Sequence, residues 1–204
     1  MTDWQNERSR IPRHGLTLVE LVVVLTILVA LAGLALPRLM STAELAGETA
    51  ARASLVVLRD ATSQLWRDCK YDLDALSGAD RRLALTDLIT ARSGLRLFDP
   101  SVTLGWNGPY VEQTGTYAVT GATAADYTTV YGSDGDAAVL DPWRRPFVIQ
   151  EPNPATTLGL PRDVRIVSAG EDGIFTITEA TASTDLLSGS VNTGDDIYVS
   201  ITLR

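Results

Sequence analysis

The sequence predicts an α+β protein in which a long N-terminal helix packs on a small antiparallel sheet. Two observations support this class. An apolar run from Leu16 to Leu36 is followed by a segment rich in Ala, Leu, Glu and Arg, which is typical of helix. From Val102 onward Thr, Val, Tyr and Gly dominate and turn signals recur, which favours short strands. With 204 residues and 45% hydrophobic content, the chain suits one modest core attached to an apolar helix.

The apolar run, LTLVELVVVLTILVALAGLAL, spans about 31 Å as a helix, which matches the hydrocarbon core of a bilayer. Arg8, Arg10 and Arg13 precede it against only two acidic residues, so we expect the N-terminus to stay cytoplasmic and the remainder to face outward. An ordinary secretory signal is the alternative. It predicts a shorter apolar region and a small-residue cleavage site, and it gives no reason for a carboxylate inside the run.

Glu20 is that carboxylate. A charge at the centre of a membrane helix costs roughly 2.5–3.5 kcal/mol and normally has a compensating partner. We therefore interpret Glu20 as a functional residue.

Pro37 lies where the apolar run ends. Proline inside a helix removes a hydrogen bond and costs roughly 3 kcal/mol, so Pro37 either stops the helix or weakens it. The segment from Arg38 to about Tyr71 still has helical character, which favours a weak point at the membrane exit. A mostly apolar stripe recurs there at spacings of four and three: Ala51, Leu55, Leu58, Thr62, Leu65 and Cys69. Cys69 is thereby predicted to pack in the core.

The rest of the chain is predicted to form short elements. Ala84–Thr90 has the pattern of an apolar helical turn, and Ser133–Asp136 that of a hairpin turn. The strand candidates are Tyr117–Val119, Tyr127–Val130, Pro146–Gln150, Val164–Ser168, Ile174–Thr178 and Ile197–Leu203.

The segment Gly15-Leu16-Thr17-Leu18-Val19-Glu20 resembles the prepilin peptidase site of type IV pilins and pseudopilins. The resemblance implies that a peptidase cuts after Gly15 on the cytoplasmic side and methylates the new N-terminus at Leu16. It also implies that Glu20 of one subunit meets the new amine of a neighbour, which supplies the partner that a buried carboxylate requires. Pro37 falls where the family carries its helix-disrupting proline.

Two further segments resemble the major pseudopilin of type II secretion. They are Trp106-Asn107-Gly108-Pro109-Tyr110 and Asp141-Pro142-Trp143-Arg144-Arg145-Pro146-Phe147. Trp and Pro fix turns and fill cores, so we interpret both segments as fold-forming. The chain departs from the family at Arg144, which replaces the usual glycine, and in an extra stretch from Glu112 to Val139.

Ser168–Gly173 and Gly194–Ile197 resemble the closing segments that hold calcium in that family. The resemblance implies ligands from Asp172, Asp195 and Asp196, with backbone oxygens near Val167 and Ser168. Calcium prefers six to eight hard oxygen ligands, and no Lys or Arg is expected beside these carboxylates. Asp172 and Asp195 are farther apart in the sequence than in the compact family loop, so ordinary acidic surface turns are the alternative.

Composition excludes several functions. The net charge of −8 and the lack of a basic stripe after residue 16 argue against a nucleic-acid partner. A single cysteine allows no internal disulfide, and a single histidine, His14, removes the usual triads and zinc sets. Hydrolase and phosphate-loop motifs are lacking, so we expect the protein not to be an enzyme.

The resemblance implies a cytoplasmic leader (1–15), a transmembrane and polymerisation helix (16–36) and a periplasmic, type IV pilin-like head (37–204), with an amphipathic helix to about residue 75. We expect a single-pass inner-membrane subunit of a type II secretion pseudopilus, a homo-oligomeric helical fibre that drives protein export. Its expected partners are minor pseudopilins, the prepilin peptidase and the inner-membrane assembly platform. The alternatives are a type IV pilus or competence pilin, which usually closes its C-terminal loop with a cysteine pair, and a membrane-tethered periplasmic enzyme or binding module.

Overall fold

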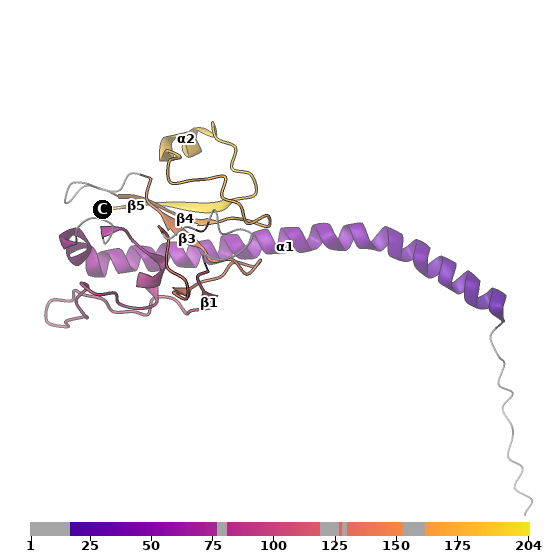
Figure 1. Cartoon of the computed structure of the whole chain (residues 1–204), viewed down its shortest axis with the longest axis horizontal. Helices are drawn as coiled ribbons and strands as arrows, with labels where there is room; N and C mark the ends of the chain where they lie inside the picture. The colour runs from indigo at the N-terminus through magenta and orange to yellow at the C-terminus, as the bar shows by residue number, and fades with distance from the viewer. Residues whose placement is uncertain (1–16, 77–80, 119–126, 128–129, 153–161) are drawn as a thin grey trace, which may run out of the picture. The chain divides into compact units, whose positions relative to one another are not determined.

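The computed structural model describes residues 17–76, 81–118, 127, 130–152 and 162–204, without the side chains of 35–43. It confirms the α+β class, with helices and a small antiparallel sheet (Figure 1). The elements are α1 (Leu18–Ala75), the 3₁₀ helix η2 (Leu85–Leu88), β1 (Gly115–Thr116), β2 (Ala137–Ala138), β3 (Val148–Gln150), β4 (Arg162–Ser168), α2 (Ser183–Ser188) and β5 (Ile197–Leu203).

The long helix α1 is shared between two compact units, Met1–Glu44 and Leu45–Arg204. Its backbone is helical on both sides of Pro37, as the sequence predicts, and through Pro37 itself, so this proline does not end the helix. The side chain of Pro37 lies outside the described residues.

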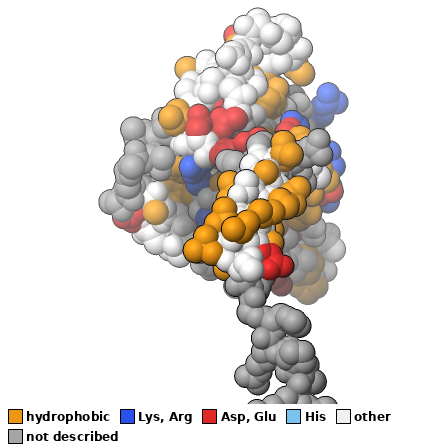
Figure 2. Space-filling view, turned by 90° about the vertical axis from the view of Figure 1, so that its right-hand side faces the viewer, with side chains coloured by type: hydrophobic (Ala, Val, Ile, Leu, Met, Phe, Trp, Pro, Cys, Tyr) orange, Lys and Arg blue, Asp and Glu red, His pale blue; other side chains and the backbone are white. Residues whose placement is uncertain are grey.

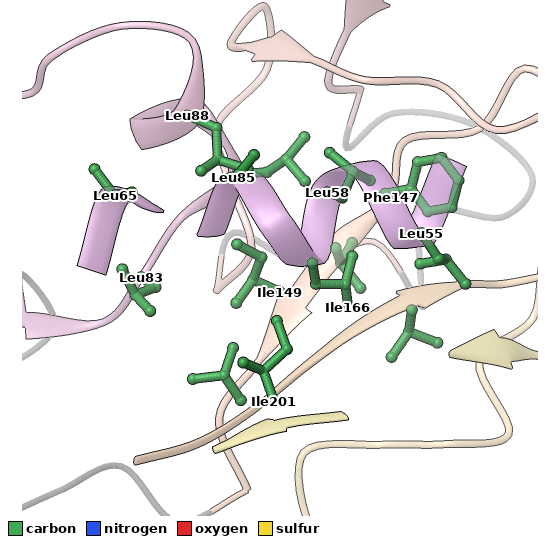
Figure 3. Close-up of a cluster of buried hydrophobic side chains, with 14 of the residues drawn as sticks. Leu55, Leu58, Leu65, Leu83, Leu85, Leu88, Phe147, Ile149, Ile166 and Ile201 are labelled. Atoms are coloured by element: carbon green, nitrogen blue, oxygen red, sulfur yellow. The ribbon is translucent and has the colours of Figure 1, made fainter. Parts of the chain in front are cut away.

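The predicted stripe of α1 forms one side of the core of the second unit. All six of its residues are buried, including Cys69 and Thr62, whose hydroxyl donates to the Leu58 carbonyl at 2.8 Å. Figure 3 shows Leu55, Leu58 and Leu65 of α1 facing side chains from the sheet and from the segment around η2. The prediction of an amphipathic second half of the helix is confirmed, because its alternating spacing of four and three places these residues on one face.

The main sheet has the order β3-β4-β5 and is antiparallel throughout. β4 is the central strand: Ile166 pairs with Ile149 on one side and with Val199 on the other. The predicted strand Ile197–Leu203 is confirmed with its exact bounds, and those at Pro146–Gln150 and Val164–Ser168 are confirmed with shifted starts. β1 and β2 form a separate small antiparallel pair. The predicted turn directly precedes β2, and there the Asp136 N–H donates to the Ser133 carbonyl.

Three strand predictions fare differently. Ile174–Thr178 is wrong, because this segment forms no strand; its backbone is bound by side chains, with the Ile177 N–H donating to Asp196 Oδ2 at 2.6 Å. In Tyr117–Val119, Tyr117 and Ala118 follow the strand Gly115–Thr116 and are not part of it, and Val119 lies outside the described residues. In Tyr127–Val130, Tyr127 is not in a strand and residues 128–129 lie outside the described part.

Both tryptophan segments form turns against the core, as predicted. The Trp106 indole N–H donates to the Asp87 carbonyl at 2.7 Å, and its ring meets Tyr110 edge-on. Trp143 lies so close to α1 that a Cβ at Gly47 would stand 3.0 Å from its ring. The glycine therefore allows the turn to approach the helix closely.

Candidate functional site

The first candidate site is the N-terminal end of α1. Gly15 and Leu16 lie outside the described residues. The side-chain oxygen of Thr17 accepts the N–H of Glu20 at 3.2 Å, and its carbonyl accepts the N–H of Leu21 at 3.1 Å. Thr17 is thus an N-cap, and Glu20 lies in the first turn, where a negative charge favours the positive end of the helix.

This cap was available in the sequence and was missed. Thr17 and Glu20 have the Thr-x-x-Glu spacing of a capping box, in which the two residues satisfy the free N–H groups of the first turn. The local role does not exclude a second one, because the carboxylate can still meet a cation from outside the helix.

The side chains after the cap are apolar on every face of the helix. From Leu18 to Leu34, each large hydrophobic side chain is between 48% and 80% exposed within the chain. Figure 2, which looks at the side of the molecule where α1 begins, shows hydrophobic side chains on the surface of this helix. A helix that is apolar all round is stable only when something covers it, and the described residues of its own unit do not cover it.

Among the described residues, no helix is long and apolar enough to cross a bilayer.

The second candidate site is the pair of acidic turns after β4 and before β5. The structure brings Asp172 and Asp195 together: the Asp172 N–H donates to Asp195 Oδ2 at 3.0 Å. Gly170 also lies directly against Asp195, so closely that a Cβ at this glycine would collide with Asp195. The 23 residues of separation in sequence therefore do not keep the two turns apart.

Asp196 is the buried member of this group, with 7% of its surface exposed. Its Oδ2 accepts the Ile177 N–H, whereas its Oδ1 is buried without a hydrogen-bond partner. Burial raises the pKa of Asp196 to about 6, backbone N–H groups oppose this, and the charges of Asp195 and Asp172 raise it further. A buried carboxylate oxygen without a partner is the kind of atom that a bound cation would satisfy.

Val167 and Ser168, whose backbone oxygens were expected near the ion, have other contacts. Val167 pairs in register with Val148 and Tyr198 in the sheet. The Ser168 hydroxyl donates to Asp141 Oδ2 at 2.7 Å. Asp141 also accepts the N–H of Arg145, so this carboxylate organises the turn after β2.

Arg145 is the residue that sequence reasoning missed. Its Nη1 donates to the carbonyls of Gly170 and Glu171, at 2.6 Å each, and its guanidinium lies against Gly173. The expectation that no Lys or Arg lies beside the acidic turns is therefore wrong. The sequence carries little sign of this contact, because residues 145 and 170 are brought together only by the fold.

In the described part of the chain, no three or more His, Cys, Asp or Glu side chains are grouped so that they could hold a metal ion.

Comparison with protein-family models, with curated proteins and with solved structures finds no match to this chain.

Proposed function

We propose that the protein is a structural subunit that assembles through its N-terminal helix, as a pseudopilin of type II secretion does. The observation that supports this most is the helix from Leu18 to Leu34, which is apolar and exposed on every face. At roughly 25 cal/mol per Å² of apolar surface, such a helix gains much more from a bilayer or from neighbouring helices than from water.

Glu20 gives the assembly its specificity. It is the one charged residue between Leu16 and Leu36, and a carboxylate among apolar helices needs a cation. Cleavage after Gly15 would create an amine at Leu16, one turn away in sequence. In the fibre, that amine of one subunit compensates Glu20 of the next, so a helix added out of register leaves a charge unpaired.

The head is then the part that faces the periplasm, and the chain works by polymerising instead of by catalysis. Minor pseudopilins, the prepilin peptidase and the inner-membrane platform are the partners that this function requires. A type IV pilus or competence pilin is the second candidate within the class. The single cysteine of the chain disfavours it, because those pilins usually close the C-terminal loop with a cysteine pair. A tethered enzyme or binding module gives Glu20 no role beyond the first turn of the helix.

Mass spectrometry of the protein extracted from membranes tests the processing step. We expect the mature chain to begin at Leu16 with a methylated amine. Gly15→Val should block cleavage, whereas Gly33→Ala should not, because a Cβ at Gly33 meets nothing within 4 Å. A wild-type chain that starts at Met1, or that is cut beyond Leu36, contradicts the proposal.

We also propose a calcium ion at the acidic turns, and the unpartnered Oδ1 of Asp196 favours it. Asp172, Asp195 and Asp196 are not grouped closely enough in the structure to hold the ion as they stand, so binding would draw their carboxylates together, and backbone oxygens and water would complete the shell. The ion would neutralise the repulsion between these carboxylates and join the turn after β4 to the one before β5.

Thermal melting of the full chain in detergent, with calcium, magnesium or chelator, tests this. Calcium at a hundred times Kd should stabilise the folded state by roughly 2.7 kcal/mol and raise Tm. Magnesium should do less, since it demands tighter octahedral geometry. Asp195→Asn should lose the calcium response, whereas Asp163→Asn, at the opposite end of β4 from the acidic turns, should keep it. Equal wild-type Tm values with calcium and with chelator contradict the ion site.

A further inference from the structure

The turn after β4 closes around a positively charged side chain. Arg145 reaches it from the turn between β2 and β3, and its Nη1 donates to the carbonyl oxygens of Gly170 and Glu171, at 2.6 Å each. The Gly173 N–H donates to the Ala169 carbonyl at 3.1 Å, which completes the turn. Two carbonyl oxygens that converge on one point repel each other unless a positive charge lies there. The turn therefore folds around a cation that belongs to the chain itself.

Arg145 is held in this place by contacts at both of its ends. Its N–H donates to Asp141 Oδ1 at 2.8 Å, and its carbonyl accepts the Asp141 N–H at 2.7 Å. At the other end, a Cβ at Gly173 would stand 2.5 Å from the guanidinium carbon, so glycine lets the turn approach the charge this closely. Because the backbone and the guanidinium are both bound, Arg145 is a fixed charge beside the turn.

The same turn meets the acidic pair on its other side. Gly170, whose carbonyl is bonded to Arg145, lies directly against Asp195, and Asp195 Oδ2 also accepts the Asp172 N–H at 3.0 Å. A divalent cation at these carboxylates would have the charge of Arg145 as a neighbour, and like charges repel. It would also find the carbonyls of Gly170 and Glu171 already bonded, although calcium needs six to eight oxygen ligands. Both effects weaken the binding of a metal ion.

We propose that Arg145 sets the affinity of the acidic turns for divalent cations, as a competing cation built into the chain. It keeps the turn after β4 in shape without a metal ion, and it weakens calcium binding at Asp172 and Asp195. The inference rests on the proposed function only for the choice of calcium as the competing ion. Removal of the charge should have two opposite effects, lower stability without calcium and tighter binding of calcium. A side chain that only supported the fold would, when removed, weaken both.

Calorimetric titration of calcium chloride into the full chain in detergent, together with thermal melting in chelator, tests the proposal. Arg145→Gln removes the charge and keeps an N–H donor, so it should disturb the turn less than an apolar residue does. We expect its calcium Kd to be several-fold lower than that of wild type, and its Tm in chelator to be lower. Arg145→Met provides a second neutral variant, for which the same two changes are expected.

Three controls make the result specific. Arg145→Lys keeps the positive charge and three N–H donors, so it should restore both the calcium Kd and the Tm in chelator towards wild type. Arg144→Gln removes a charge from the exposed neighbour in the same turn and should leave the calcium Kd unchanged. Asp195→Asn, added to Arg145→Gln, should abolish the gain in binding, because that gain arises at the acidic turns.

The outcomes separate this inference from the proposed ion site. Calcium binding by Arg145→Gln without binding by wild type would support the inference and contradict the ion site in the natural chain. Binding by both proteins with equal Kd, or weaker binding by the variant, would overturn the inference and leave the ion site standing. No binding by wild type or by either neutral variant would overturn both.

Discussion

Both parts of α1 are helical, but they differ in whether their apolar side chains are exposed or buried. In the part from Leu18 to Leu34, every large hydrophobic side chain is exposed, whereas in the part from Ala51 to Leu73 a stripe of apolar residues is buried against the sheet. The second part therefore obtains its stability inside the chain. In the proposed function, the first part obtains it from a bilayer or from other subunits.

Polar groups show the same contrast. In the head, Arg165 is buried and donates to Gln150 Oε1 and to the carbonyls of Thr178 and Thr181, so the charge is satisfied internally. Among the described residues, no donor comparable to these acceptors is bonded to the carboxylate of Glu20, which lies in the first turn of the helix. Substitutions in the head should therefore change stability, and substitutions at Glu20 should change assembly.

The largest effect on the head is expected for Arg165→Met. The substitution leaves Gln150 and two backbone carbonyls without their donor, and burial already lowers the pKa of Arg165. Loss of several charge-assisted hydrogen bonds should lower the free energy of unfolding by about 3–5 kcal/mol. Arg67→Met, at an exposed position of α1, should change it by less than about 0.5 kcal/mol. Urea unfolding followed by tryptophan fluorescence measures the stability of both variants. Equal midpoints for the two would show that Arg165 does not stabilise the head.

A smaller effect is expected from the buried carboxylate of Asp87. Burial raises its pKa to about 6, against the opposing charge of Arg92, whose Nε lies 3.2 Å from Asp87 Oδ1. A carboxylate with a raised folded-state pKa stabilises the fold below its unfolded value, near pH 4, and this contribution is lost as the pH rises through about 6. Asp87 alone should therefore make the head more stable at pH 5 than at pH 7, by on the order of 1–2 kcal/mol.

Asp87→Asn should remove this contribution. Comparing the pH dependence of Tm for wild type and variant isolates Asp87 from the other carboxylates, and Asp60→Asn, an exposed residue of α1, provides the control. If Asp87→Asn and wild type gain equal stability between pH 7 and pH 5, Asp87 is not the titrating group.

The smallest effect is expected at Arg144, which adopts a φ of 67° in the turn between Asp141 and Arg145. This left-handed conformation costs a non-glycine residue roughly 1–2 kcal/mol. Glycine avoids this cost, but its greater conformational freedom also stabilises the unfolded chain, so only part of the cost is recovered. Arg144→Gly should therefore raise the free energy of unfolding by about 0.5–1 kcal/mol, and Arg144→Ala should not. A stability of Arg144→Gly at or below that of Arg144→Ala would show that the turn is not strained.

Much of the head could be predicted because its signals are local. The spacing of Leu55, Leu58 and Leu65 predicts the buried face of α1, and the alternation of Ile197–Leu203 predicts β5 with its exact bounds. Ile174–Thr178 has the composition of a strand but forms none, since Arg165, Gln150 and Asp196 take its backbone groups. These contacts join residues far apart in the sequence, which no local pattern encodes.

At the acidic turns, too, one contact could be predicted from the sequence and another could not. The meeting of Asp172 with Asp195 follows from the pairing of β4 with β5, which brings the ends of neighbouring strands together. Arg145 could not be predicted there, because its position depends on how the turn after Asp141 packs across the sheet. Gly15 and Leu16 remain predictions from the sequence.

The most direct test of the account compares Glu20→Gln with Glu44→Gln, both exposed residues of α1, by cross-linking the full-length proteins in membranes. Glutamine keeps the size of the side chain and removes the charge, so Glu20→Gln should insert into the membrane as well as wild type or better. Its oligomer ladder should nevertheless fall sharply, because the amine of the neighbouring subunit loses its partner, whereas Glu44→Gln should keep a wild-type ladder. Equal ladders from Glu20→Gln and wild type would contradict the claim that this carboxylate directs assembly.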